Sequence, residues 1–451
     1  MSKTFLPWHV DDVWLLPASI HDFVPAGHVA HLIRDVVRNE VDQSAIVSAY
    51  VEEARGAPPY HPGMMVALVL YAYSQGVYSS RRIARGCEER LDFAAVTGMQ
   101  CPDFRTISDF RKRHLEALKG LFVEVLRLCR EAGLAKLGHV ALDGTKIKAN
   151  ASKHKAMSYG RMVEAEPKLA AEVEDWMKKA VQTDAAEDGE HGVQRRGDEM
   201  PEWVANKQKR LAKIREAKAA LEAEAQAAEN NGPVDGGDAG GPAGQTAATP
   251  AKPADKAQRN FTDAESRIMK TKDGFIQGYN AQAAVDASSQ VIVAQDLSQN
   301  GSDKQQMGPM LAAIEAANGG NPEQLSADAG YCSEDSLGKL SERAIDGYVA
   351  TGRQKHGAAD AAGDNHGKPG TRTQAMRDKL RQGGFEGPYR LRKQTVEPVF
   401  GQIKQARGFR QFLLRGFAKA RAEWSLLCTV HNLLKLVAER RRLQLLVVEA
   451  G

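Results

Sequence analysis

The sequence predicts an α+β protein, in which a helical N-terminal domain precedes a mixed β-sheet flanked by helices. Three observations predict this class. Residues 1–137 show the helical spacing of apolar residues, strand-like segments begin at residue 139, and residues 229–258 are too poor in large apolar side chains to form a core. Because 451 residues exceed one typical core, we expect several domains.

The N-terminal domain, residues 1–137, is predicted to consist of helices. An apolar run, Met64–Tyr73, follows Pro62 and Gly63, a pair that suits the start of a buried helix. Two later short helices carry clustered arginines and resemble a helix-turn-helix in outline, which predicts DNA binding. Basic helix ends are also common in helical bundles that bind no DNA, so this signal is weak by itself.

The pattern changes at His139–Lys148, which reads as a strand, and residues 138–159 are predicted to form the first part of a second domain. Residues 160–228 return to a charged, alanine-rich helical pattern and are interpreted as an insertion. The next segment, 229–258, contains six Gly, four Pro and seven Ala, with Val234 as its only large apolar residue. It is predicted to be a disordered linker.

The second domain resumes over residues 259–451. Two strands, Phe275–Val285 and Gln290–Gln295, form a predicted hairpin. A helix, a strand ending at Ala327, a mixed segment and a final helix near 417–442 follow. Without the insertion the order is β-β-β-α-β-α, which fits a mixed sheet flanked by helices. In that arrangement the first and fourth strands are neighbours.

A late helix has two distinct faces. Pro398 is typical of a first helical turn and Thr395 can cap it, so the helix is predicted to begin near Thr395. One apolar stripe is formed by Val396, Val399, Phe400, Ile403 and Ala406. Another face carries Glu397 and Lys404, a carboxylate and a cation suited to metal and phosphate. Glu397 could alternatively serve only the helix dipole.

Charge is unevenly distributed. The net charge is +4, yet residues 371–421 hold 13 Lys and Arg against three acids, a balance of +10 that leaves −6 elsewhere. Such a block predicts a polyanionic partner, whereas its structural alternative is a solvated helical face. The five cysteines show no CxxC spacing, and no apolar run approaches the ~20 residues of a membrane span. A cytoplasmic protein is therefore expected.

Three carboxylates are the candidate catalytic residues. Asp143 lies on the first predicted strand, Asp328 ends the fourth, and Glu397 lies on the late helix, so the predicted fold brings them together. Carboxylate oxygens suit Mg²⁺ or Mn²⁺, and two such ions can support phosphoryl transfer. Asp286 and Asp296 compete for the second role, but a hairpin turn and a strand end explain them better.

These residues resemble the DDE transposases of bacterial insertion sequences, which have an RNase H-like catalytic domain. Asp143 stands in Leu-Asp-Gly-Thr and Asp328 in Asp-Ala-Gly-Tyr, as the two family aspartates do. The family signature Tyr-x2-Arg-x3-Glu-x6-Lys is matched in two halves, since four residues separate Arg392 from Glu397 and the expected position carries Lys393.

The resemblance implies cleavage at the ends of a mobile element in double-stranded DNA, followed by attack of the freed 3′-OH on target DNA. Asp143, Asp328 and Glu397 would hold two Mg²⁺ or Mn²⁺ ions. The residues implied to contact DNA are Tyr389, Arg392, Lys393, Lys404, Arg407 and Lys146. Because two terminal inverted repeats must be paired, a homodimer on DNA is expected.

Three other functions are compatible with parts of the sequence. A domesticated or decayed transposase would bind DNA only, and a host nuclease with an RNase H-like fold would share the metal site. Leu-Asp-Gly-Thr is also similar to the haloacid-dehalogenase motif Asp-x-Asp-Gly-Thr, but Ala141 replaces the nucleophile of that motif.

Overall fold

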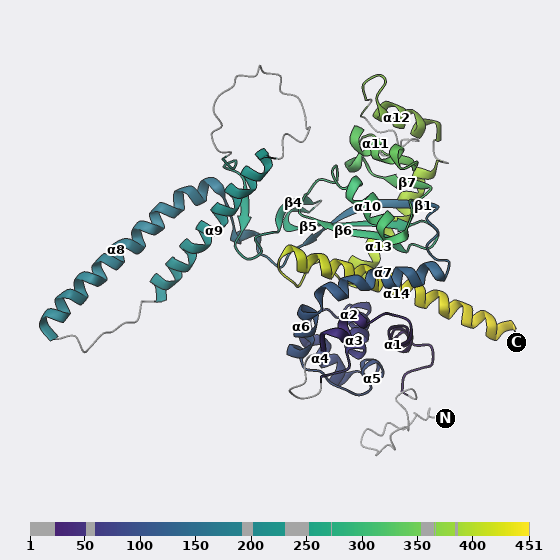
Figure 1. The fold of residues 1–451 in the computed structure, drawn as a ribbon, viewed down its shortest axis with the longest axis horizontal. Helices are drawn as coiled ribbons and strands as arrows, with labels where there is room; N and C mark the ends of the chain where they lie inside the picture. The colour runs from purple at the N-terminus through teal and green to yellow at the C-terminus, as the bar shows by residue number, and fades with distance from the viewer. Residues whose placement is uncertain are drawn as a thin grey trace, which may run out of the picture.

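The computed structural model describes residues 23–50, 59–191, 202–230, 252–271, 273–352, 365, 367–383 and 387–450. The fold is mixed α+β, as predicted, with a mainly antiparallel and partly parallel sheet flanked by helices and a helical N-terminal region (Figure 1). The predicted linker falls largely on residues 231–251, which lie outside the described residues.

The main sheet is built around its first strand. Its strands are β1 (His139–Lys148), β4 (Arg267–Thr271), β5 (Gly274–Asp286), β6 (Ile292–Ser298), β7 (Gln324–Ala327) and β8 (Asp346–Val349). β1 pairs antiparallel with β5 and parallel with β7, β8 continues in parallel beyond β7, and both β4 and β6 pair with β5. The predicted adjacency of the first strand and the strand ending at Ala327 is confirmed.

Helices cover both faces of this sheet, which explains the long buried run in β5. The flanking helices are α10 (Met307–Asn318), α11 (Glu334–Glu342), α12 (Arg372–Gly383), α13 (Leu391–Gly401) and α14 (Phe417–Ala450). α13 packs on β1 and β5, and α10 and α14 both pack on β6. The predicted final helix is confirmed, since α14 buries Trp424, Leu427 and Val430.

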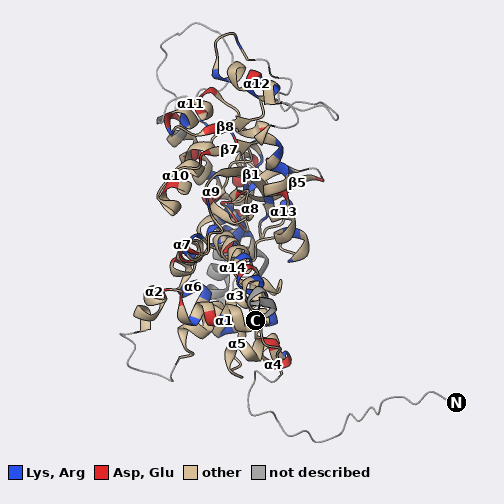
Figure 2. Cartoon of the chain, turned by 90° about the vertical axis from the view of Figure 1, so that its right-hand side faces the viewer, with Lys and Arg blue, Asp and Glu red and all other residues tan. Residues whose placement is uncertain are grey.

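The N-terminal helices form a second layer below the sheet in Figure 1. They are α1 (Val29–Asn39), α2 (Ser44–Val47), α3 (Pro62–Ser74), α4 (Ser80–Glu89), α5 (Leu91–Thr97), α6 (Phe104–Arg113) and α7 (Leu115–Glu131). α7 packs along α14, and α3 also contacts α14, so the C-terminal helix joins both parts of the chain. Lys and Arg occur in both parts (Figure 2).

A buried polar network fixes this junction. Glu423 on α14, 2% exposed, accepts hydrogen bonds from the backbone N–H groups of Leu413 (2.9 Å) and Leu414 (3.2 Å). It also accepts one from the hydroxyl of Tyr73 on α3, which in turn accepts one from Arg111 on α6 at 3.0 Å. The network thus ties the N-terminal helices to the loop that follows α13.

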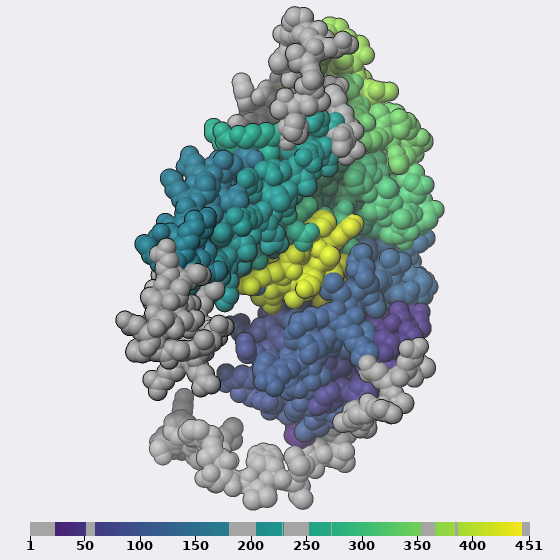
Figure 3. All heavy atoms as spheres, turned by 60° about the vertical axis from the view of Figure 1, so that its left-hand side comes forward, coloured from purple at the N-terminus to yellow at the C-terminus, as the bar shows by residue number. Residues whose placement is uncertain are grey.

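The insertion forms an arm that projects from one end of the sheet. It contains β2 (Ala156–Ser158), α8 (Tyr159–His191), α9 (Glu202–Asn230) and β3 (Gln258–Asn260). β2 pairs with β3 at the base, and a small apolar cluster that includes Met162 and Ile214 holds the two helices together. From the side of the arm, α14 is visible between the arm and the N-terminal helices (Figure 3).

Two sequence-based predictions need correction. No strand was predicted between Lys148 and Phe275, but β2, β3 and β4 lie there, because such short strands carry no clear apolar alternation. α13 begins at Leu391 rather than near Thr395, and Thr395 donates to the carbonyl of Leu391 instead of capping the helix. Pro398 therefore lies inside the helix, where it cannot bond to the carbonyl of Gln394. Gln290 donates to that carbonyl at 3.1 Å and compensates.

The junction yields a stability prediction. Glu423→Ala removes the acceptor of one buried and two partly buried donors, each lost bond costing about 1 kcal/mol, so the free energy of unfolding is expected to fall by about 3 kcal/mol. Urea denaturation measures this change. Lys419→Ala, on the exposed face of the same helix, is the control. A Glu423→Ala protein as stable as the Lys419→Ala protein would contradict the structural role of the network.

Candidate active site

Asp143 and Asp328 are brought together by the parallel pairing of β1 and β7. In that register Leu142 is opposite Ala327, so the two aspartates occupy the next positions on neighbouring strands. Neighbouring strands lie ~4.8 Å apart, which places the two carboxylates side by side, one in the middle of β1 and one directly after β7. β7 ends at Ala327, and Asp328 caps the following turn by accepting a hydrogen bond from Gly330 N–H at 2.9 Å.

Arg392 provides the cation of this site. Its guanidinium forms a salt bridge with Asp143 at 2.8 Å, and the two side chains are only 8% and 17% exposed. The ring of Tyr389 lies 5.8 Å from the guanidinium. The expectation that Arg392 and Tyr389 belong to the phosphate-binding region stays a prediction, but their side chains lie beside the candidate carboxylates.

The electrostatics of the site oppose two ionised carboxylates. Burial raises the pKa of Asp143 to about 6, although Arg392 acts in the opposite direction, and the neighbouring Asp328 adds repulsion. Burial also raises the pKa of Asp328, again against the influence of Arg392. One arginine therefore does not offset the loss of water around this pair, and an added divalent cation would favour both charged forms.

A third carboxylate near the pair, Asp303, was not found by the sequence analysis. Its Oδ1 accepts hydrogen bonds from Asn280 and Gln282, both at 2.7 Å. Gln282 also accepts a bond from the hydroxyl of Tyr331, three residues after Asp328. Asp303 lies in a loop without periodicity. The available signal was the pair of polar residues at alternate positions inside the buried strand β5.

Glu397 is not brought into contact with the two aspartates. It is exposed on α13, little more than one turn after Arg392, whereas Val396, Val399, Phe400 and Ile403 form the predicted buried stripe. The stripe was also predicted to include Ala406, but Ala406 is exposed. The chain after Gly401 forms a π-helical turn, Gln402–Ala406, which rotates the side chains after it relative to those of α13. Within the described residues, no three His, Cys, Asp or Glu side chains lie close enough to hold a metal ion.

The two competing aspartates have structural roles. Asp286, 1% exposed, accepts hydrogen bonds from the backbone N–H groups of Lys136 and Leu137 and closes the hairpin turn through Ser288. Asp296 is ion-paired with Arg421 at 2.7 Å. Neither is available to the site formed by Asp143 on β1 and Asp328 after β7.

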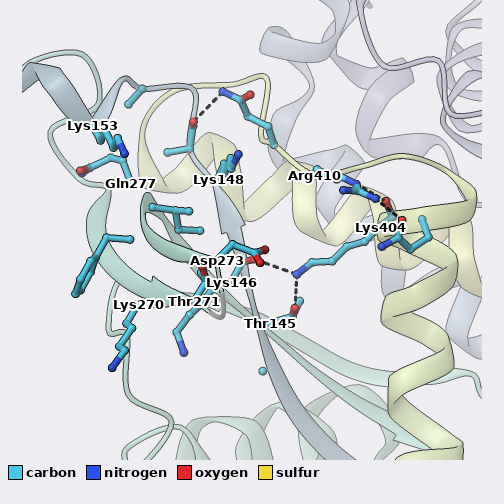
Figure 4. Close-up of a pocket in the computed structure, with 17 residues that line it drawn as sticks. Thr145, Lys146, Lys148, Lys153, Lys270, Thr271, Asp273, Gln277, Lys404 and Arg410 are labelled. Carbon is cyan, nitrogen blue, oxygen red and sulfur yellow. Dashed lines mark hydrogen bonds between the residues drawn. The ribbon is translucent and has the colours of Figure 1, made fainter.

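A basic groove of about 990 Å³ begins beside the aspartates, because Gly144 and Thr145 line it. Its cations come from β1, the β2 region, the β4–β5 hairpin and the chain after α13: Lys146, Lys148, Lys153, Lys270, Lys404 and Arg410 (Figure 4). Of the lining residues that the structure describes, Asp273 is the one acid. Among the described residues, none of these six cations forms a salt bridge with a carboxylate.

The predicted DNA-contacting residues are distributed unevenly around this groove. Lys146 and Lys404 line it, and Lys404 donates to Thr145 Oγ1 and, at 3.0 Å, to the carbonyl of Lys146. Lys393 is exposed on α13. Arg407 does not line the groove. Its guanidinium lies 3.4 Å from His431 Nδ1, and burial lowers its pKa.

The raised pKa of Asp143 yields a pH prediction. Between pH 3.8 and about 6, the Asp143 carboxyl is protonated in the folded state and ionised in the unfolded state. Because the folded state binds more protons, the contribution of Asp143 lowers the free energy of unfolding as pH rises through that window. Asp143→Asn is therefore expected to be more stable than the wild type at pH 7, by up to about 3 kcal/mol, and equally stable near pH 4.

Urea denaturation across pH 4–7 without divalent ions measures this difference, with Asp109→Asn, an exposed position, as the control. A stability difference that does not change with pH would show that Asp143 is not desolvated as the geometry requires.

Two family models match the chain. A model described as Transposase domain (DUF772) matches residues 18–113, and one described as Transposase DDE domain matches residues 245–433. Asp328 and Glu397 fall inside the second match, and Asp143 lies between the two. No curated protein and no solved structure matches the chain. No helix in the described ranges has the length and apolar character needed to cross a membrane.

The two matches together cover more than half of the chain, and the matched order of an N-terminal transposase domain and a DDE domain agrees with the fold. The chain belongs to the DDE transposases of insertion-sequence type.

Proposed function

We propose that this transposase cuts DNA at the ends of its own element and transfers the freed strands to target DNA by metal-dependent phosphoryl transfer. The observation that carries the proposal is the pair Asp143 and Asp328, side by side where β7 ends against the middle of β1 and next to a basic groove. The parallel core strands with antiparallel β5 and β6 beside them support an RNase H-like catalytic domain.

The donor chemistry fits a divalent cation, since two crowded carboxylates with raised pKa values gain from one. Asp143 and Asp328 would hold Mg²⁺ or Mn²⁺, with Glu397 as the third ligand in this proposal. Two bound ions would stabilise charge on the attacking and leaving oxygens of the phosphodiester. The role of Glu397 rests on its place in the signature rather than on contact, because Glu397 is exposed on α13 while Arg392 of the same helix is paired with Asp143.

The chain's own cations would position DNA. Arg392 is paired with Asp143, and it would turn its guanidinium to a phosphate once other charge compensates the carboxylates. Tyr389 restrains the guanidinium from one side. Lys146 and Lys404 extend the positive surface from Thr145 into the groove, where the backbone leaving the scissile phosphate would lie.

The proposed partners are double-stranded terminal repeats and target DNA, bound by a homodimer because two ends must react together. The N-terminal domain would add contacts outside the groove. On α4, Arg81, Arg82 and Arg85 are exposed, although Arg85 is also ion-paired with Glu89. Their position on one short helix favours contact with the DNA backbone.

Cleavage assays with DNA that carries the element ends test this function. With Mg²⁺, the wild type is expected to cut at the ends, whereas Asp143→Asn, Asp328→Asn and Glu397→Gln each lower the cleavage rate by at least about 100-fold and retain DNA binding. Asp303→Asn, which alters a neighbouring carboxylate outside the proposed ligand set, is expected to keep measurable cleavage.

Full loss of cleavage in Asp303→Asn together with normal cleavage in Glu397→Gln would exchange the roles of these two residues. Binding without any cleavage by the wild type would instead favour a descendant that only binds DNA. Equal cleavage of ends and of unrelated DNA would favour a general nuclease.

Salt dependence tests the groove. Lys148 is exposed, lines the groove and has no carboxylate partner among the described residues. If it contacts one phosphate, Lys148→Ala reduces the slope of log K against log salt concentration by about 1. Fluorescence anisotropy at several salt concentrations measures this slope. Lys339→Ala is the matched control, because Lys339 is paired with Asp335 on α11. Identical slopes for both variants would exclude the groove as the DNA path.

A further inference from the structure

The tip of the β4–β5 hairpin presents an aromatic side chain that the fold does not use. Phe275 is 63% exposed, whereas the cores described above bury most other large aromatic side chains. It stands directly opposite Lys270 in the hairpin register, and the turn between them includes Gly274 with φ +106°. Nothing in the packing of the sheet requires an aromatic residue at this position.

The residues around Phe275 indicate which kind of molecule its ring contacts. It lines the basic groove together with Lys270 and Lys153, and the nearest acid in that lining is Asp273. An exposed aromatic ring among unpaired cations is the arrangement with which proteins bind nucleic acid, since bases stack on the ring while the cations hold phosphates. The six cations that line the groove extend from β1 to the β4–β5 hairpin, which favours a continuous polyanion over a protein partner.

We infer that Phe275 stacks on a base of the element end, at a fixed distance from the cut, and thereby helps to place the scissile phosphate at Asp143 and Asp328. This inference rests on the proposed function, because it takes DNA as the occupant of the groove. Phe275 is a positioning residue: it contacts the DNA away from the reacting phosphate and acts through the path of the strand.

The sheet sets the distance. Asp143 is paired with Ala283 on β5, and Phe275 lies eight residues further along that strand. At ~3.3 Å per residue, Phe275 lies roughly 26 Å along β5 from Ala283, the residue opposite Asp143. This distance corresponds to about eight nucleotides at ~3.4 Å each. The strand is continuous between the two points, so the spacing is fixed by hydrogen-bonded backbone rather than by a loop.

The test uses full-length protein and end DNA in which 2-aminopurine, a fluorescent base, replaces single bases from three to thirteen nucleotides from the cut. Wild-type protein is expected to raise the fluorescence only near position eight, where a base leaves its stack. Phe275→Ala is expected to lose this signal and to bind roughly five- to 150-fold more weakly. Phe275→Tyr restores both, and Leu443→Ala, a 48% exposed residue near the C-terminus, changes neither.

Each outcome is decisive. A wild type that binds and cuts ends with no local fluorescence change, or with one that persists in Phe275→Ala, overturns the inference and leaves the proposed function intact. Failure of the wild type to bind the ends overturns both. A Phe275→Ala protein that loses self-association in sedimentation without DNA, while binding DNA normally, assigns the ring to a second copy of the chain instead.

Discussion

The candidate site depends on one set of hydrogen bonds, the parallel pairing of β1 with β7. Because Leu142 is opposite Ala327, the next residue of each chain segment, Asp143 or Asp328, lies beside the other. A shift of one residue would turn one carboxylate to the opposite face of the sheet. The register is held by buried side chains of both strands, so the geometry of the candidate site is a consequence of core packing.

A second constraint lies below the sheet. Glu423 accepts hydrogen bonds from the chain after α13 and from Tyr73, so one buried carboxylate connects the N-terminal helices to the segment that carries groove residues. Tyr78 adds a bond to the carbonyl of Arg407 at 2.8 Å. The chain that carries Arg410 and Gln411 into the groove is therefore held in part by the N-terminal helices.

Much of this arrangement could be predicted from the sequence, because its determinants are local. The strand at 139–148, the hairpin of β5 and β6 and the stripe of α14 follow from apolar periodicity. The start of α13 could not be predicted, since the acceptor left free by Pro398 is satisfied by Gln290, a residue more than a hundred positions away. Asp303 was missed for the same reason, because its hydrogen-bond donors, Asn280 and Gln282, are more than twenty residues away in the sequence.

The central claim is that Asp143 and Asp328 form one cation site, and iron-directed backbone cleavage tests it most directly. Fe²⁺ with ascorbate and peroxide generates radicals that cut the chain near a bound ion, and mass spectrometry locates the cuts. The account predicts cuts near residues 143 and 328 that excess Mg²⁺ suppresses and that Asp143→Asn and Asp328→Asn abolish. Cuts elsewhere, or cuts that persist in both variants, would contradict it.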